Sequence, residues 1–311
     1  MKQIIPIFFS CDNNYIPYLS VTIQSLIDHA APDIEYRIYV LHTDINEESQ
    51  KKLLTQEREN IKISFVSVLD KIKNISNKLD DVRDYYTQTI FYRLFIAELF
   101  PNYSKAIYLD CDIIILDDLK DFFNINLNNN IVACVVDKIV AHNDDFKVYV
   151  KEFLGVDNEH YFNSGVLLIN LDEYRKEQVE DAFYQMVTNY SFKSVAPDQD
   201  FLNYVLKNRH LEISEDYNRM PIADDYNGEM KIIHFNMFMK PWLYDNVIYE
   251  DYFWKYAKET IFYEDIKEVK NNYSDKNKAS DLEGVKRMER ECYEIIHSNY
   301  TYVKLFTKFQ K

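Results

Sequence analysis

The sequence predicts an α/β fold built on a mainly parallel β-sheet. Two observations lead to this prediction: apolar runs of strand length recur along the chain, and most are followed by segments in which apolar residues repeat at helical spacing. Such alternation is typical of α/β proteins, in which a helix crosses the sheet between two parallel strands. The 311 residues are enough for one large α/β domain with an appendage, or for two domains.

The first half of the chain shows the alternation most clearly. Strands are expected at 4–9, 36–41, 61–68 and 106–116. Helices are expected at 46–58, at 87–99 before Pro101, and from residue 16 onward, where one face carries Ile16, Leu19, Ile23, Leu26 and Ile27. The polar stretch 70–86 carries no clear element.

The second half is less regular, and its elements are assigned from shorter runs. Strands are expected at 131–137, 161–170 and 231–235. Helices are expected at 173–190, 198–206, 249–262 and 287–311. Residues 270–278 are polar and are expected to form a linker.

The run from Ala106 to Leu116 is apolar except for Asp110 and Asp112. Side chains alternate along a strand, so these two carboxylates are expected on the same side of a buried strand end. Burying charges without a partner is costly, and a divalent cation such as Mg²⁺ or Mn²⁺ is the usual resolution. The alternative is structural: the two acids end a strand and cap a turn, and Asp198 and Asp200 repeat the same spacing.

The charge and the composition exclude several classes of protein. The formal net charge is −15, so the surface repels nucleic acid and offers no basic groove for a phosphate backbone. No apolar run is long enough to span a bilayer. The four cysteines are scattered and fit buried thiols in a reducing cytosol better than disulfides or a zinc site. We therefore expect a cytoplasmic protein.

Glycine is scarce, and its scarcity limits how a nucleotide could be held. The chain has only four glycines, at positions 155, 165, 228 and 284, and they cannot form a dinucleotide-binding turn or a Walker loop. A sugar-nucleotide pyrophosphorylase would also need a glycine-rich loop after the first strand, where Ser10–Tyr15 contains none. Any nucleotide bound here must rely on other groups, which is a second reason to expect a cation.

Two polar clusters are expected at one edge of the sheet. Ser10–Tyr15 follows the first strand, and Asp110 and Asp112 lie at a later strand end. Ligands of parallel α/β sheets bind beyond the carboxyl ends of the strands. We therefore expect both clusters to face the same ligand.

Six ordered motifs together resemble the family 8 retaining glycosyltransferases, over roughly residues 4–242. They are Ser10–Tyr15, Phe91-Tyr-Arg-Leu94, Tyr108-Leu-Asp-Cys-Asp112, Tyr161–Asn170, Pro197-Asp-Gln-Asp200, and His234 with Lys240-Pro-Trp242. The resemblance implies a GT-A fold, which is a single nucleotide-sugar-binding α/β domain. We expect that domain at 1–243 and a C-terminal helical extension at 244–311.

The resemblance also implies roles for single residues. The metal ligands would be Asp110, Asp112 and His234, holding Mn²⁺ or Mg²⁺. The donor nucleotide would contact Asp12, Asn14, Tyr15, Arg93, Asp110 and Lys240, with Asp12 and Tyr15 at the uracil, Asp110 near the ribose and Lys240 at the diphosphate. The catalytic residues around the donor sugar would be Asp137, Asn163, Asp198 and Gln199, with Gln199 nearest the reacting face of the anomeric carbon.

Each assignment has a structural alternative. His234 could be a half-buried histidine at a strand end, and Tyr15 could serve packing in a chain with 26 tyrosines. Arg93 could pair with a buried acid, a role compatible with a place beside the sugar. Asp198 could cap the helix that follows Pro197.

The activity implied is transfer of a hexose, glucose or galactose, from a UDP-sugar to an acceptor hydroxyl, with retention of anomeric configuration. The acceptor would be a cell-envelope glycan or glycoconjugate, free or lipid-linked, because the family includes enzymes that extend lipopolysaccharide. Gln199 is an amide and a poor nucleophile, which favours a front-face, oxocarbenium-like path. One departure from the family motif matters: Met237 stands where glycine is often found. The alternative function is therefore an impaired UDP-sugar-binding or scaffold protein.

The C-terminal tail allows two interpretations. Lys304, Lys308 and Lys311 accompany an apolar helical face formed by Tyr302, Leu305, Phe306 and Phe309. Such a tail could rest weakly and peripherally on the inner face of the membrane, although the net charge of −15 opposes this. A helix packed on the catalytic domain is the slightly favoured alternative.

Overall fold

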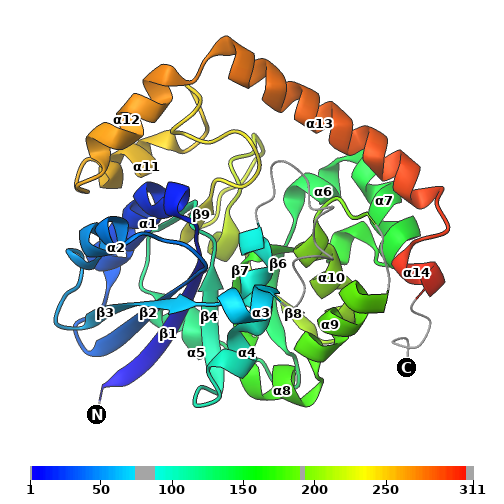
Figure 1. Ribbon diagram of the computed structural model, residues 1–311, viewed down its shortest axis with the longest axis horizontal. Coiled ribbons are helices and arrows are strands. Elements are labelled where there is room, and N and C mark those ends of the chain that lie inside the picture. The colour runs from blue at the N-terminus through cyan, green and yellow to red at the C-terminus, as the bar shows by residue number, and fades with distance from the viewer. Residues whose placement is uncertain (1, 74–87, 190–192, 306–311) are drawn as a thin grey trace.

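The computed structural model describes residues 2–73, 88–189 and 193–305 and shows an α/β architecture around a seven-stranded sheet (Figure 1). The strand order is β3-β2-β1-β4-β7-β6-β8. The strands are β1 (Gln3–Ser10), β2 (Ile34–His42), β3 (Ile61–Ser67), β4 (Lys105–Leu109), β6 (Val132–Val136), β7 (Phe162–Asn170) and β8 (His210–Glu212). The pairs β1–β2, β2–β3, β1–β4 and β6–β8 are parallel, whereas β7 runs antiparallel to β4 and β6. The predicted mainly parallel sheet is confirmed.

Helices cover both faces of this sheet. In the first half they are α1 (Ile16–His29), α2 (Glu47–Leu54), α3 (Leu69–Lys73), α4 (Ile96–Leu99) and α5 (Leu119–Asn124). In the second half they are α6 (Lys138–His142), α7 (Asp144–Leu154), α8 (Leu171–Lys176), α9 (Val179–Asn189), α10 (Pro197–Leu206), α11 (Glu250–Ala257), α12 (Tyr263–Asn272), α13 (Asp275–Ile296) and α14 (Tyr302–Leu305). Figure 1 shows α1 and α11 on one side of the sheet and α9 and α10 on the other.

The core consists of two apolar clusters, one on each face of the sheet. Alternate residues of β1 enter opposite clusters: Phe8 belongs to the cluster that contains residues of α7, α9, α10 and α13, while Ile7 and Phe9 belong to the cluster that contains residues of α1, α5, α11 and α12. A strand buried on both faces needs apolar side chains at every position, which explains the continuous apolar runs in the sequence. The four cysteines are buried free thiols, as expected.

The expected strand at 106–116 is two strands, so this prediction was wrong in its local structure. β4 ends at Leu109, and β5 (Ile113–Ile115) pairs antiparallel with β9 (Ile232–His234) in a separate two-stranded sheet. The hydroxyl of Thr22 in α1 donates to the carbonyls of Cys111 (3.0 Å) and Ile113 (2.7 Å) and holds the chain where it leaves the main sheet. The acidic pair therefore lies in the connection between two strands, and strand alternation does not explain its geometry.

Several helix predictions also need correction. Residues 88–95 form a 3₁₀ helix that continues into α4, and residue 87 lies outside the described part of the chain. The helix expected at 173–190 is divided into α8 and α9, because Gln178 has a φ of +54° and breaks the run. Helix α2 begins after its cap, Asn46, and ends at Leu54, and α11 covers only Glu250–Ala257 of the expected 249–262. Residue 190 and most of 70–86 are also outside the described residues.

The C-terminal region differs most from expectation. The predicted linker at 270–278 is mostly helical, since α12 ends at Asn272 and α13 begins at Asp275 after the capping box of Ser274 and Asn277. Figure 1 shows α13 (orange to red) running across the top of the molecule toward α7. The helix expected at 287–311 is interrupted, because α13 ends at Ile296 and α14 follows. Residues 306–311, with Phe306, Phe309, Lys308 and Lys311 of the tail, lie outside the described residues.

Tyr302 of α14 is buried in the core, with its ring 5.0 Å from that of Phe153 and 4.9 Å from that of Tyr204. This supports the alternative of a packed helix for the described part of the tail. No helix within 2–73, 88–189 or 193–305 is both long and apolar enough to cross a bilayer.

Asp200, in the first turn of α10, ties this helix to its surroundings. Its buried carboxylate accepts hydrogen bonds from the hydroxyls of Tyr149 and Tyr161, both at 2.7 Å, from the hydroxyl of Ser194, and from the backbone N–H of Ala196 at 3.2 Å. Burial raises the pKa of Asp200, and these hydrogen bonds oppose that shift. Four donors therefore depend on one acceptor group.

We expect Asp200→Asn to lower the free energy of unfolding by about 1–3 kcal/mol, because the new NH₂ group faces donors and leaves at least one of them without an acceptor. Urea unfolding followed by circular dichroism measures this. Asp251→Asn, on an exposed position of α11, is the matched control and should stay within about 0.5 kcal/mol of the wild type. Equal losses in both variants would contradict the anchoring role of Asp200.

Candidate active site

A cavity of about 390 Å³ lies at the carboxyl ends of β1 and β4. Its lining contains both polar clusters that the sequence analysis placed at one edge of the sheet. The predicted site residues that line it are Asp12, Tyr15, Arg93, Asp110, Asp112, Asp137, Asn163, Asp198, Gln199, His234 and Lys240. Side chains separated by more than two hundred residues in the sequence thus meet in one place.

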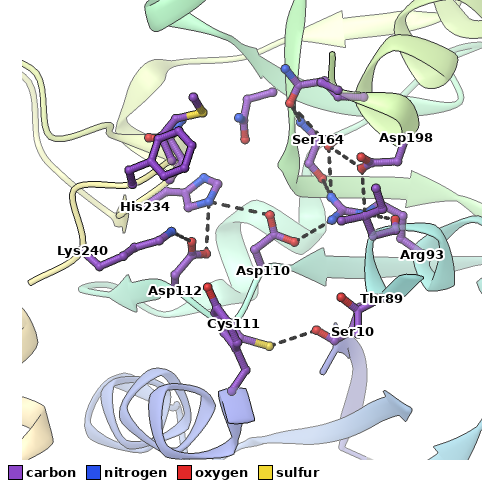
Figure 2. A pocket seen from close by; sticks show the side chains of 18 of the residues that line it. Ser10, Thr89, Arg93, Asp110, Cys111, Asp112, Ser164, Asp198, His234 and Lys240 are labelled. Carbon is purple, nitrogen blue, oxygen red and sulfur yellow. Dashed lines mark hydrogen bonds and ion pairs between the residues drawn. The ribbon is translucent and has the colours of Figure 1, made fainter. Parts of the chain in front are cut away.

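Asp110, Asp112 and His234 converge at the floor of this cavity (Figure 2). The antiparallel pairing of β5 with β9 sets His234 opposite Ile113, directly beside Asp112. Nε2 of His234 lies 3.2 Å from Oδ1 of Asp112 and 3.7 Å from Oδ2 of Asp110. One ligand atom from each of the three residues fits within 4.8 Å of the others.

The close approach of His234 and Asp110 requires a glycine at position 165 in β7. A Cβ atom there would lie 2.3 Å from Cε1 of His234 and 2.5 Å from Oδ2 of Asp110. Both distances are far below van der Waals contact, so any side chain at this position would push the two groups apart. The absence of a side chain at Gly165 therefore makes room for the cluster.

The electrostatics of Asp112 fit a cation site. Burial by itself would raise the pKa of Asp112, but the nearby charge of Lys240, joined by that of His234 when its imidazole is protonated, outweighs burial and holds the pKa well below its usual value. Lys240 donates to Oδ2 of Asp112, while Oδ1 is buried and accepts no hydrogen bond from the described residues. Two carboxylates and an imidazole suit Mg²⁺ or Mn²⁺, with positions left for other oxygen ligands. These three residues can hold a divalent cation.

Arg93 connects the acidic cluster to helix α10. The buried guanidinium donates to Oδ1 of Asp110 (2.9 Å) and to the carbonyl of Ser164 (2.6 Å), and lies 3.3 Å from Oδ2 of Asp198 (Figure 2). It also lies 4.4 Å from the ring centroid of Tyr108. Arg93 thus pairs with buried acids and lines the cavity as well, so both interpretations of this residue hold.

The amide of Gln199 is held at both ends. Its Nε2 donates to Oδ2 of Asp137 (3.1 Å), and its Oε1 accepts from the backbone N–H of Ser164 (3.0 Å). Asn163 donates to the same oxygen of Asp137 (3.1 Å). Burial raises the pKa of Asp198, and the nearby Arg93 opposes that shift. This wall of the cavity is therefore a pre-arranged set of amides and carboxylates.

The opposite wall is formed by the segment after β1. One carboxylate oxygen of Asp12 caps the 3₁₀ helix Asn13–Tyr15 by accepting from the backbone N–H groups of Asn14 (2.9 Å) and Tyr15 (3.1 Å). The ring of Tyr15 is 37% exposed and meets Tyr18 edge-on at 5.4 Å. Asn14, predicted to bind substrate, has an exposed side chain and lies outside the cavity lining.

Met237, the departure from the family motif, adopts a φ of +63°, the left-handed conformation that glycine favours. Its side chain is 37% exposed and lines the cavity. The structure therefore combines a left-handed backbone at this position with a side chain in the cavity lining.

The sequence analysis missed several lining residues. Tyr108, whose hydroxyl donates to Oδ1 of Asp110 at 2.8 Å, and Ser164 both lie inside recognised motifs and could have been considered. Tyr273 and Asp281 come from the segment around the expected linker, and the hydroxyl of Tyr273 donates to Oδ2 of Asp281 at 2.5 Å. Nothing in the local sequence marked these two residues as part of the site.

Comparison with known proteins assigns the chain to a family. A model described as Glycosyl transferase family 8 matches residues 6–246. A Haemophilus influenzae protein named as a glycosyltransferase is 28% identical over 228 residues, which are 72% of this chain and 66% of that protein. A glycosyl transferase of Streptococcus gordonii, Gly, is 30% identical over 247 residues, 76% of this chain but only 32% of the relative. The chain therefore spans about one third to two thirds of the length of these two relatives.

Solved structures show the same fold. The galactosyltransferase LgtC, crystallised in complex with donor and acceptor sugar analogs, superposes with a TM-score of 0.68 at 24% identity, covering 83% of this chain and 96% of LgtC. The bifunctional protein WbbM superposes with a TM-score of 0.71 at 22% identity, covering 88% of this chain and 52% of WbbM. The match of the family model over most of the chain shows that the chain belongs to glycosyltransferase family 8.

Proposed function

We propose that this glycosyltransferase moves a hexose, glucose or galactose, from a UDP-sugar to an acceptor hydroxyl, with retention of configuration and with Mn²⁺ or Mg²⁺ bound. The observation that carries the proposal is the cluster of Asp110, Asp112 and His234 at the floor of a cavity. A base-binding segment with Tyr15 lies on one side of it and the amide of Gln199 on the other. This order matches the parts of a nucleotide sugar: base, diphosphate and hexose.

The proposed roles are those that the family resemblance implies, and the shared cavity supports them. Asp12 and Tyr15 hold the uracil, Asp110 lies near the ribose, and Arg93 with the residues around Gln199 contacts the hexose. A cation held by Asp110, Asp112 and His234 supplies the positive charge that makes UDP a better leaving group. The side chain of Asn14 does not line the cavity. We therefore limit its role to the backbone N–H, which donates a hydrogen bond to Asp12.

Lys240 supplies a second positive charge at the same place. Its Nζ donates to Asp112 and to the backbone carbonyl of Phe235. Because Lys240 contacts the carboxylate of Asp112, its ammonium group would add positive charge close to a diphosphate bound at this cluster. The lysine thus stabilises the developing negative charge on UDP.

Gln199 and Asp198 position the sugar. The amide of Gln199 donates to Asp137 and accepts from Ser164, so its orientation is fixed before substrate binds. An amide is a poor nucleophile, and we therefore propose a front-face path through an oxocarbenium-like transition state. Asp198, Asp137 and Asn163 stabilise and align the reacting sugar.

The acceptor is a glycan or glycoconjugate of the cell envelope, free or lipid-linked. We place the catalytic domain at 1–243 and a C-terminal extension at 244–311, whose residues Tyr273 and Asp281 line the cavity. The second candidate function is an impaired UDP-sugar-binding or scaffold protein, suggested by Met237. The left-handed backbone at Met237 favours the active enzyme, because it is a conformation that the usual glycine can also adopt.

UDP binding should require a divalent cation, and UDP should be released when the protein is incubated with UDP-glucose or UDP-galactose, Mn²⁺ and an acceptor. Asp112→Asn should abolish both properties without unfolding the chain, since it removes a charge from the cation site. Calorimetry with UDP in Mn²⁺ and in EDTA measures the first, and UDP release measures the second.

Asp117→Asn is the matched control, because Asp117 pairs with Lys231 outside the cavity lining. This variant should bind and release UDP as the wild type does. The same UDP affinity in EDTA as in Mn²⁺ would overturn the cation requirement. Cation-dependent UDP binding without any turnover would favour the scaffold function.

UDP should bind roughly tenfold or more tightly than CDP, because Asp12 can accept from the base N–H of uracil, and an unmade buried hydrogen bond costs about 1–3 kcal/mol. Asp12→Ser keeps a side chain able to cap the 3₁₀ helix but too short to reach the base. Calorimetry should show this variant losing most of the preference for UDP. Comparable binding of CDP and UDP by the wild type would refute the assignment.

Met237→Gly should raise the free energy of unfolding by up to about 1 kcal/mol, because glycine removes the left-handed strain of about 1–2 kcal/mol while gaining freedom in the unfolded chain. UDP affinity should change by less than about threefold, which corresponds to well under 1.4 kcal/mol. Urea unfolding and calorimetry provide the two values. A much tighter binding of UDP would mean that the methionine side chain obstructs the diphosphate.

A further inference from the structure

Asn218 is a buried residue beside the site that no sequence motif singled out. It ends the 3₁₀ helix Glu215–Asn218 and is only 1% exposed. The next residue, Arg219, bridges to β9: its N–H donates to the carbonyl of Ile232 (2.8 Å), and its carbonyl accepts from the N–H of His234 (2.9 Å). The backbone therefore fixes the side chain of Asn218 next to the imidazole of His234.

The orientation of a neighbouring amide, Asn163, follows from two contacts. Its Nδ2 faces Oδ2 of Asp137 at 3.1 Å, and a carboxylate can only accept. Its Oδ1 accepts from the backbone N–H of Gly165 at 3.0 Å, and this N–H can only donate. Both contacts agree, so the oxygen and nitrogen of the Asn163 amide are assigned without ambiguity.

The orientation of Asn163 determines that of Asn218, which in turn determines which nitrogen of His234 carries a hydrogen. Because Oδ1 of Asn163 is an acceptor, the group of Asn218 that faces it at 3.0 Å must be Nδ2. The other end of the Asn218 amide, Oδ1, then faces Nδ1 of His234 at 3.0 Å. An amide oxygen cannot donate, so Nδ1 must carry a hydrogen.

The consequence appears at the opposite nitrogen of the ring. In the neutral imidazole only one nitrogen carries a hydrogen, so Nε2 keeps its lone pair. Nε2 is the atom that faces Asp112 Oδ1 at 3.2 Å and Asp110 Oδ2 at 3.7 Å. A lone pair and two carboxylates directed at one point form the donor set of a cation and would repel one another without one.

We propose that Asn218 is a positioning residue that fixes the Nδ1–H tautomer of His234 and so presents Nε2 as a metal ligand. Through Asn163 and Asp137, it also joins this ligand to the amide of Gln199, which donates to the same oxygen of Asp137 at 3.1 Å. The cation site and the sugar side of the cavity thus share one continuous chain of hydrogen bonds. The inference rests on the proposed cation site and assigns it a supporting residue that touches neither the cation nor the donor.

The first experiment reads the tautomer directly in the metal-free protein. Long-range ¹H–¹⁵N NMR of ¹⁵N-labelled protein distinguishes ring nitrogens that carry a hydrogen from those that do not, and His234→Gln identifies the signals of this ring. Nδ1 of His234 should carry a hydrogen in every spectrum of the folded protein. A neutral ring with its hydrogen on Nε2 would overturn the proposal.

The second experiment measures Mn²⁺ affinity by calorimetry without nucleotide. Asn218→Leu removes the acceptor at similar volume and should weaken Mn²⁺ binding by about 10–100-fold, the usual effect of losing a group that orients a metal-binding histidine. Asn218→Asp keeps an acceptor toward Nδ1 and should retain the Nδ1–H signal. Asn203→Leu is the control: this amide is equally buried, at 1% exposed, but bonds to Phe162 and the backbone of Gln199, so Mn²⁺ affinity should stay within about twofold.

The outcomes separate this inference from the proposed function. Unchanged Mn²⁺ affinity and an unchanged Nδ1–H signal in Asn218→Leu would refute the positioning role. A wild type that binds no Mn²⁺ would refute the proposed cation dependence, while the NMR spectrum would still decide the tautomer. If Asn218→Leu fails to fold, the wild-type spectrum and the Asn218→Asp variant still decide it.

Discussion

The repulsion between two neighbouring carboxylates, those of Asp110 and Asp112, is the constraint on which the rest of this site depends. Each acid is compensated from a different direction. Arg93, from the 3₁₀ helix before β4, forms an ion pair with Asp110, whereas Lys240, from the loop after β9, forms an ion pair with Asp112. His234 lies between the two acids. Partly buried charges of this kind need oppositely charged partners close by, so the site draws together segments from most of the chain.

Much of the fold could be predicted because its central strands are buried on both faces. β1 stands out in the sequence as a continuous apolar run, and the helix after β1 shows its packing face at regular spacing. The break between β4 and β5 could not be predicted in the same way. It is imposed by pairing with β9, which lies far along the chain, and by the hydroxyl of Thr22. Local composition carries no information about such a partner.

In the candidate site too, residues within local motifs could be predicted from the sequence, whereas residues placed by distant contacts could not. Residues with reactive side chains inside ordered motifs, such as Asp110 and His234, could be assigned from the sequence. Asn218 could not, because an isolated asparagine acquires a role only when a parallel bridge sets it against His234. The prediction of a linker at 270–278 was wrong for a different reason. The polar residues there belong to helices that bury only a narrow stripe of side chains. In α13, for example, the buried residues are Gly284, Met288, Cys292 and Ile295.

The contribution of Tyr273 and Asp281 to the cavity has a consequence for how such a protein can diversify. The cluster of Asp110, Asp112 and His234 and the segment after β1 lie before residue 244, whereas Tyr273 and Asp281 lie at the end of α12 and in α13. Changes in the terminal helices can therefore reshape one side of the cavity while leaving the charge balance at its floor intact.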